Sequence, residues 1–319
     1  MGDIRMGLIG LGSMGRHHAR VIRETPGVAL VAVADQVGDR FGVARDLDVL
    51  PDVEALIGAG IDAAIVAVPT IHHEDIALAL AAAGVHTIVE KPIAHTVEAG
   101  ERVAAAFDVA GLVGAVGYVE RCNPAILEMR RRIRDGQIGE VYQISTSRQG
   151  PFPARIADVG VVKDLATHDV DLTAWLGGAR YETIAAQVTH RSGRDHEDMV
   201  VATGRLANGV IVNHVVNWLS PRKERQTVVT GERGSLVADT LNLDLTYWEN
   251  GTVATEWDTV ANFRGVSEGD MIRYAFQKRE PLRVEMENFL AAIRGAASDV
   301  VPMDEGVETL RVIERMLRA

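Results

Sequence analysis

Three glycines near the N-terminus constrain the fold of this chain more than any other feature of its sequence. Gly10, Gly12 and Gly15 lie between an apolar run, residues 6–9, and an amphipathic stretch, residues 14–24. This order predicts a strand, a tight turn and a helix. In such a motif the first glycine permits the turn, the second lets backbone N–H groups approach a pyrophosphate, and the third lets the helix pack against the strand. The motif therefore predicts a dinucleotide site at the start of the helix.

An acidic residue, Asp35, closes the next apolar run about twenty residues beyond Gly15, where this motif places an acid. A carboxylate there accepts hydrogen bonds from both ribose hydroxyls and repels a 2′-phosphate, so NAD is expected rather than NADP, although Arg40 weakens that preference. The alternative is a turn that needs glycine only for its shape. Because strand, glycines, helix, second strand and acid occur in order, we favour a cofactor site, to which Ser13 and Met14 also contribute.

The first third of the chain alternates short apolar runs with alanine-rich helical patterns. Strands that are apolar throughout belong inside a parallel sheet covered on both faces, and the alternation implies right-handed crossovers. We therefore predict an α/β, doubly wound Rossmann domain over residues 1–119. The expected later strands are 28–34, 62–68, 86–89 and 112–116, and the expected helices include 73–83 and 96–109.

Beyond residue 120 the pattern changes to strand-like runs separated by turn signals, which predicts an α+β domain, residues 120–319, on a large and mostly antiparallel open-faced sheet. Ala207-Asn208-Gly209 and Asn250-Gly251 are expected to connect neighbouring strands as hairpins. The expected strands are 141–148, 183–190, 200–206, 210–217, 226–230 and 243–248, and the expected helices are 124–135, 283–294 and 304–318.

Charge and cysteine content exclude several classes of protein. The formal net charge is −11 and no block of lysine and arginine is long enough for a nucleic-acid or polybasic membrane site. The single cysteine, Cys122, excludes an internal disulfide and a multi-cysteine zinc site, and its expected role is packing. No apolar run reaches the roughly 20 residues of a membrane span, and we see no signal peptide, so we expect a cytoplasmic protein.

Polar residues follow three of the predicted parallel strands, where ligands of open α/β sheets bind. They are Pro69-Thr70, Glu90-Lys91-Pro92 and residues 117–121. Lys91 is the sharpest candidate, because a lysine at the cofactor crevice can exchange a proton with a substrate hydroxyl as hydride leaves its carbon. The alternative is a solvated lysine paired with Glu90.

A fourth polar cluster occupies residues 163–171. If this run is an α-helix, Asp164, His168 and Asp171 share one face. Histidine is the natural proton carrier near neutral pH, and a neighbouring carboxylate fixes its tautomer. Two alternatives remain: the array binds a metal, which we disfavour because the glycine motif already supplies a hydride acceptor, or Asp164 caps the helix while His168 packs.

These residues together resemble the glucose-fructose oxidoreductase, inositol dehydrogenase and MocA family, and the resemblance covers nearly the whole chain. The resemblance implies that Lys91 orients and polarises the reacting hydroxyl, that His168 is the general acid/base and that Asp164 orients or helps to bind substrate. It further implies dimers or tetramers formed through the exposed sheet face. The matching motifs are Gly10-Leu11-Gly12-Ser13-Met14-Gly15, Pro69-Thr70 with His73, Glu90-Lys91-Pro92, and Asp164 followed by His168. Pro69, Thr70, His73, Glu90 and Lys91 are accordingly expected at the cofactor.

Residues 117–124 and 150–162 are similar to a narrower branch of that family, the UDP-N-acetylglucosamine 3-dehydrogenase-like proteins. Arg121 and Arg155 offer cations for a nucleotide diphosphate, and Tyr118 and Asn123 offer hydrogen bonds to sugar hydroxyls, so all four are expected at the substrate. Each is individually as well suited to a surface salt bridge or a structural contact.

The resemblance implies an NAD-dependent oxidoreductase that moves hydride between nicotinamide and a secondary alcohol of a sugar or nucleotide sugar, best the 3-hydroxyl of a UDP-N-acetylhexosamine. An inositol or simple-sugar dehydrogenase is one alternative. A non-catalytic NAD-binding sensor or assembly protein is another, because fold alone does not exclude it.

Overall fold

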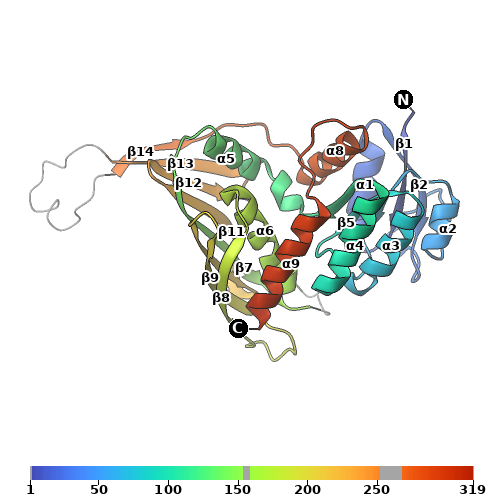
Figure 1. Cartoon of the computed structure of the whole chain (residues 1–319), viewed down its shortest axis with the longest axis horizontal. Helices are drawn as coiled ribbons and strands as arrows, with labels where there is room; N and C mark the ends of the chain where they lie inside the picture. Colours follow the sequence, from blue (N-terminus) through green and yellow to red (C-terminus); the bar gives the residue numbers. More distant parts are fainter. Residues whose placement is uncertain (1, 154–158, 252–267, 319) are drawn as a thin grey trace, which may run out of the picture. The chain divides into compact units, whose positions relative to one another are not determined.

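The computed structural model describes residues 2–153, 159–251 and 268–318. The chain divides into two compact units (Figure 1). The first contains Met1–Cys122 and Glu280–Arg311, and the second contains Asn123–Arg279 and Val312–Ala319. Across the described residues, no helix is both long enough and apolar enough to cross a membrane.

The first unit is built on a six-stranded parallel sheet with the strand order β3-β2-β1-β4-β5-β6. This is the Rossmann order, and it places the topological switch point between β1 and β4. The expected fold class is confirmed, and β3 is a short addition that the sequence did not indicate. The strands are β1 (Ile4–Ile9), β2 (Val28–Ala34), β3 (Val49–Leu50), β4 (Ala63–Val66), β5 (His86–Glu90) and β6 (Gly114–Gly117).

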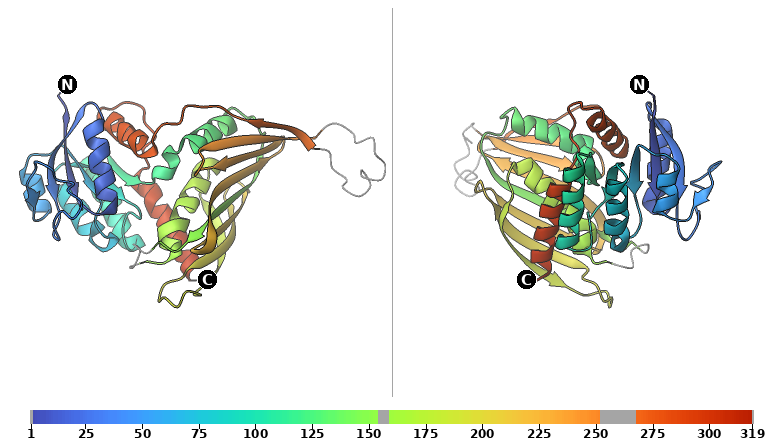
Figure 2. Two further views of the ribbon diagram at one scale, coloured as in Figure 1. Left: turned by 180° about the vertical axis from the view of Figure 1, so that it is seen from behind. Right: turned by 45° about the vertical axis from the view of Figure 1, so that its right-hand side comes forward.

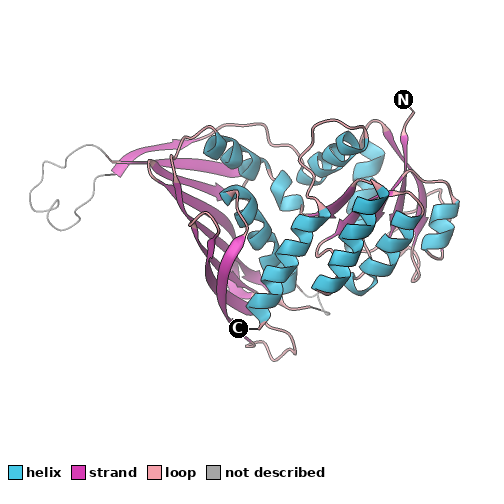
Figure 3. Cartoon of the chain, viewed as in Figure 1, coloured by secondary structure: helices cyan, strands magenta, loops and turns pink. Residues whose placement is uncertain are grey.

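Apolar clusters cover both faces of this sheet, because successive strand residues point to opposite sides. On β4, Val66 joins one cluster and Ile65 the other, and both are fully buried. Figure 3 shows helices on both sides of the sheet. The helices of this unit are α1 (Ser13–Glu24), α2 (Val53–Gly58), α3 (His73–Ala82), α4 (Val97–Ala110) and α8 (Pro281–Ile293), with 3-10 turns η1 (Thr70–His72) and η2 (Val119–Cys122).

The compact units differ from the contiguous division at residues 1–119 and 120–319. Helix α8 packs Met286 and Phe289 into the same apolar cluster as α1. Helix α9 (Met303–Leu317) contributes its first part to the first unit and its last part to the second. The sequence indicates the amphipathic face of such a helix but not which sheet that face covers.

The second unit is built on an eight-stranded sheet with the order β14-β13-β12-β11-β7-β10-β9-β8. Only the β7–β10 pair is parallel, so the expected mostly antiparallel sheet is confirmed. The strands are β7 (Val141–Pro151), β8 (Tyr181–Thr189), β9 (Met199–Leu206), β10 (Ile211–Asn217), β11 (Leu219–Gly231), β12 (Gly234–Asp239), β13 (Asp244–Asn250) and β14 (Glu268–Arg273).

Helices cover one face of this second sheet. Helix α5 (Pro124–Arg134) lies against β12 and β13, and α6 (Thr167–Gly177) lies against β7. The views of Figure 2 show no described helix on the opposite face. That face carries uncharged polar residues on the central strand β7, from Gln143 to Gln149, which are hydrogen-bonded to each other and to Asn213 and Asn217.

Three expectations for the second unit need correction. Strand β12 was missed because its short run, Gly-Ser-Leu-Val-Ala-Asp, carries only two fully buried apolar side chains. The Asn250-Gly251 signal does not form a hairpin turn, since β13 ends at Asn250 and β14 begins at Glu268. Residues 162–166 form a π-helical turn rather than part of an α-helix. The expected hairpin at Ala207-Asn208-Gly209 is confirmed by the antiparallel β9–β10 pair.

Candidate active site

The three glycines of the β1–α1 turn each solve a different steric problem. Gly10 has φ +95°, and a Cβ there would lie 2.5 Å from the backbone of Ala67. A Cβ on Gly15 would lie 1.9 Å from the carbonyl oxygen of Gly10, so the helix packs on the turn only without a side chain. Gly12 has no atom within 4 Å of its Cβ position, because it lines an open cavity. A side chain at Gly12 would occupy the space that a pyrophosphate needs.

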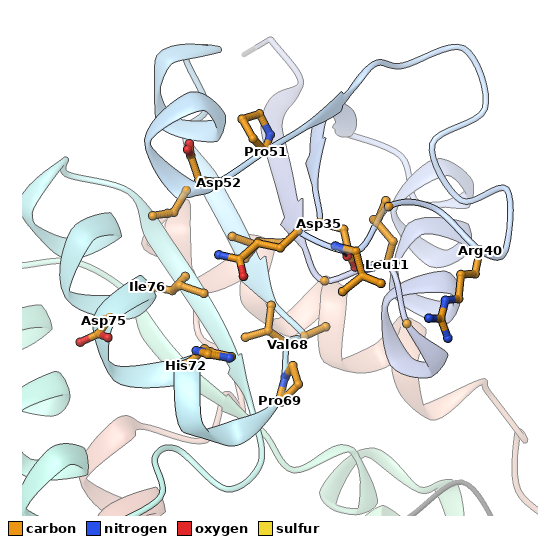
Figure 4. Close-up of a pocket in the computed structure, with 18 of the residues that line it drawn as sticks. Leu11, Asp35, Arg40, Pro51, Asp52, Val68, Pro69, His72, Asp75 and Ile76 are labelled. Carbon is orange, nitrogen blue, oxygen red and sulfur yellow. Dashed lines mark hydrogen bonds between the residues drawn. The ribbon is translucent and has the colours of Figure 1, made fainter.

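This cavity has a volume of about 590 Å³, within the range of small-molecule sites. It lies beside the switch point, between the β1–α1 turn, the end of β2 and the η1 turn (Figure 4). Its polar walls carry Asp35, Asp52, Glu54 and Asp75, while Arg40 is the one lysine or arginine among the described residues that line it. The balance of charge therefore disfavours a 2′-phosphate.

Asp35 is held in place by two backbone donors. Its Oδ2 accepts a hydrogen bond from the N–H of Leu11 at 2.7 Å, and its Oδ1 accepts one from the N–H of Val37 at 2.8 Å. Figure 4 shows the carboxylate beside Leu11 at the cavity wall. Each oxygen keeps a further lone pair, so the fixed carboxylate can still accept from two ribose hydroxyls.

Only part of the predicted cofactor set lines this cavity. Gly10, Gly12, Asp35 and Pro69 do so. His72, which follows Pro69-Thr70 in the same polar cluster but is not in the predicted cofactor set, also lines it. The predicted cofactor residues that are not among its lining residues are Ser13, Met14, Gly15, Thr70, His73, Glu90 and Lys91.

His73 makes structural contacts, and its expected place at the cofactor stays a prediction. It is only 1% exposed, and its ring nitrogens lie 2.9 Å from the carbonyl oxygen of Pro92 and 3.0 Å from that of Val68. Burial lowers the pKa of His73, against the opposing effect of the two carbonyls. His73 therefore ties the turn after β4 to the turn after β5.

Glu90 is likewise buried and engaged within the protein. One carboxylate oxygen lies 2.7 Å from Nε2 of His18, and the other accepts the backbone N–H of Lys91 at 3.2 Å. Both carboxylate oxygens thus have partners within the protein, and the expected place of Glu90 on the nicotinamide side stays a prediction. Lys91 itself is half-buried and follows β5 directly, and its peptide bond to Pro92 is cis.

In the second unit, the π-helical turn and the start of α6 carry the predicted acid and histidine. Asp164 is 8% exposed on the π turn, and His168 is half-buried one residue into α6. Ala166 is the N-cap of α6 and no side chain caps it, so Asp164 does not serve as the cap. Because a π turn is wider than an α turn, the expected spacing no longer fixes one face shared by Asp164, His168 and Asp171, and Asp171 is 1% exposed. Such turns occur often at functional sites.

Of the four residues assigned to substrate from the narrower resemblance, the three that the structure describes are buried. Tyr118 is 1% exposed in the apolar core of the first unit. Arg121 is 4% exposed and its Nη1 lies 2.7 Å from Glu305 Oε2. Asn123 caps α5 by accepting a backbone N–H and donates to a backbone carbonyl. The contacts of these three residues are structural, their assignment to substrate stays a prediction, and Arg155 lies outside the described residues.

Two family models match the chain. Residues 4–118 match the oxidoreductase family, NAD-binding Rossmann fold, and residues 126–237 match the GFO/IDH/MocA C-terminal domain. UDP-N-acetylglucosamine 3-dehydrogenase of Acidithiobacillus ferrooxidans is 31% identical over 99% of this chain and 96% of its own length. The NAD⁺-dependent scyllo-inositol 2-dehydrogenase of Bacillus subtilis is 32% identical over 57% of this chain and 56% of its own.

Solved structures agree with these matches. That of the Acidithiobacillus ferrooxidans enzyme has a TM-score of 0.85 at 27% identity, covering 99% of this chain and 97% of that one. The structure of GenD2 from gentamicin A biosynthesis, solved in complex with NAD, shares the fold with a TM-score of 0.81 at 22% identity, covering 100% of this chain and 94% of that one. The glycine turn, the fixed Asp35 and the two-unit fold thus have one common explanation. The chain belongs to the GFO/IDH/MocA family of oxidoreductases and is a dehydrogenase with an NAD-binding Rossmann unit.

Proposed function

We propose that the protein transfers hydride between NAD and a secondary hydroxyl of a sugar or nucleotide sugar, best the 3-hydroxyl of a UDP-N-acetylhexosamine. The main support for this choice of substrate is the match with UDP-N-acetylglucosamine 3-dehydrogenase, which spans nearly the full length of both chains at 31% identity. Inositol dehydrogenases of similar identity align over about two thirds of this chain or less.

The nicotinamide ring of NAD supplies the hydride acceptor, and the protein must handle the proton that leaves with it. We assign Lys91 to hold and polarise the reacting hydroxyl, because a lysine at the carboxyl end of β5 lies where open α/β sheets bind ligands. His168 takes the hydroxyl proton and, being half-buried, can pass it to water. Asp164 orients the sugar from the π turn. Proton and hydride together account for the two hydrogens that the alcohol loses.

A dehydrogenase of inositol or simple sugars is the second candidate, supported by several relatives with that name. The two candidates differ in whether turnover needs a nucleotide on the substrate. The buried single thiol, Cys122, is consistent with the reducing cytoplasm in which we place the protein.

NADH formation measured with four substrates separates these candidates. The substrates are UDP-N-acetylglucosamine, UDP-glucose, myo-inositol and glucose, each with NAD and with NADP. Turnover with a UDP-sugar alone supports the proposal, and turnover with inositol or glucose alone replaces it with the second candidate. If none of the four substrates yields NADH although the protein binds NAD, a non-catalytic sensor is favoured.

Asp35→Ala should weaken NAD binding by at least about 10- to 100-fold, which is the loss of one hydrogen bond to a charged group at about 1.5–3 kcal/mol. Asp35→Asn should lose less affinity for NAD, because its amide oxygen still accepts one hydrogen bond. Affinity for NADP should fall less than affinity for NAD in both variants, because the 2′-phosphate no longer meets a carboxylate. Calorimetric titration with each dinucleotide measures this, and an unchanged NAD affinity in Asp35→Ala would overturn the assignment.

We further propose that two copies of the chain pair through the free face of the eight-stranded sheet. That face is uncharged along β7 and has no described helix on it, which supports a sheet-to-sheet contact with a second copy. Ser147→Arg at its centre would bring like charges together across a two-fold axis and should yield monomers by light scattering. Val109→Arg, on a residue 88% exposed on α4, is the control and should leave the assembly intact.

A further inference from the structure

Two neighbouring histidines on α1 have opposite environments. His17 is exposed, whereas His18 is 1% exposed and its Nε2 lies 2.7 Å from Oε1 of Glu90. Within the part of the chain that the structure describes, Nδ1 of His18 has no hydrogen-bond partner. The contact with Glu90 is therefore the one polar interaction that the buried imidazole makes there, and His18 donates through Nε2.

Glu90 transmits this contact to the backbone of Lys91. Its second oxygen accepts the Lys91 N–H, so each oxygen of the carboxylate has its own donor. The carboxylate also rests against β6, where a Cβ on Gly117 would lie 3.3 Å from the carboxyl carbon. A side chain at residue 117 would crowd the Glu90 carboxylate. Because Gly117 has no side chain, the carboxylate has room for this orientation.

The charges around Glu90 show that it is the ionised member of a buried pair. Burial raises its pKa, but the hydrogen bond and charge of His18 and the charge of Lys91 outweigh burial and lower it below the usual value. Glu285 on α8 faces it, and burial together with the Glu90 charge raises the pKa of Glu285 well above its usual value. His73 on α3 also faces Glu90. A charge on one of two neighbouring buried carboxyls disfavours a charge on the other, so the pKa shifts favour the charge on Glu90 over Glu285.

We propose that His18 is a positioning residue for hydride transfer: by hydrogen-bonding Glu90 it fixes the backbone at Lys91 and thereby the placement of the Lys91 amine. The inference rests on the proposed role of Lys91 in catalysis. Without the His18 donor, one oxygen of a buried carboxylate loses its hydrogen bond, and the group turns or takes up a proton to recover one. Either change releases the Lys91 N–H, and a misplacement of about 1 Å at a reacting group costs about 100-fold in rate.

His18→Leu should therefore lower kcat about 100-fold while NAD affinity stays within about twofold, because the dinucleotide cavity is lined by other residues. His18→Gln should restore most of the loss, since its amide nitrogen reaches the position of Nε2. His17→Leu is the matched change one residue earlier on the exposed side of the helix, and it should change neither kcat nor NAD affinity. Steady-state kinetics and calorimetric NAD titration measure both quantities.

The two buried glutamates provide a second test in which the volume of the core is unchanged. Glu90→Gln removes the charge that His18 and Lys91 need and should reduce kcat about as much as His18→Leu. Glu285→Gln replaces a protonated acid by its neutral isostere and should leave kcat and stability unchanged. Equal losses in the two variants, or none in Glu90→Gln, would overturn the inference.

A double-mutant cycle separates positioning from a general structural effect. If His18 acts through Lys91, the loss caused by His18→Leu should disappear in a Lys91→Met background, whereas independent structural damage adds to it. Full activity of Lys91→Met alone would overturn the proposed function and this inference together. An inactive Lys91→Met with a normal His18→Leu would overturn only the inference.

Discussion

Lys91→Met should lower kcat about a thousandfold and leave the affinity for NAD within about threefold, because proton transfer by a positioned side chain contributes about 10²- to 10⁴-fold to a rate. Methionine keeps most of the length and apolar stem of lysine but has no hydrogen to donate to the substrate oxygen. NAD binding should survive, since Lys91 does not line the large cavity that contains Asp35.

The comparison needs a lysine outside any site. Lys278 is suitable because it is solvent-exposed and pairs with Asp244 at 3.1 Å, an interaction contributing at most about 1 kcal/mol. Lys278→Met should keep wild-type turnover. Single-turnover NADH formation and calorimetric titration give the two measurements. A Lys91→Met enzyme with normal kcat would remove Lys91 from the catalytic group.

The glycine motif could be recognised from sequence because its determinants are local. Gly10, Gly12 and Gly15 act on a single turn, and the acid that follows them has a fixed place at the end of the next strand. The strand order and the cavity follow from the same alternation of strands and helices. Those parts of the fold and of the cofactor site were therefore predictable.

The contacts that the sequence could not indicate belong to residues with distant partners. Tyr118, Arg121 and Asn123 have side chains suited to a sugar nucleotide, and only the packed core shows that each is buried and engaged. No local pattern pairs Arg121 with a glutamate on α9 or Asn123 with a carbonyl that follows β12.

His18 was missed although the sequence carried a signal. Gly15, His18, Ala19 and Ile22 have the spacing of one helix face, and all four are buried. That spacing separates His18 from His17 and marks it as a buried histidine that needs a partner. Its partner on β5 is 72 residues away in sequence, so the contact itself required the structure.

The second large effect is expected from Arg148→Met, which should destabilise the second unit by about 3–5 kcal/mol. Arg148 on β7 is 4% exposed, and its Nε lies 2.9 and 3.0 Å from the two carboxylate oxygens of Asp169, which is 2% exposed on α6. Removing Arg148 takes away the opposite charge of a buried pair, which is strongly destabilising. Asp169 follows His168 directly, so activity should fall as well.

Tryptophan fluorescence isolates this effect, because the four tryptophans lie between residues 175 and 257, within the second unit. Urea unfolding followed in this way should show a lower midpoint for Arg148→Met. The double variant Arg148→Met/Asp169→Leu should regain much of the loss, since an apolar pair of similar volume often replaces a buried ion pair at little cost. Arg131→Met removes an exposed helix ion pair and should change stability by less than about 1 kcal/mol. If Arg148→Met also changes stability by less than about 1 kcal/mol, water must reach the Asp169 carboxylate. In that case α6 is held to the sheet by its apolar contacts rather than by this ion pair.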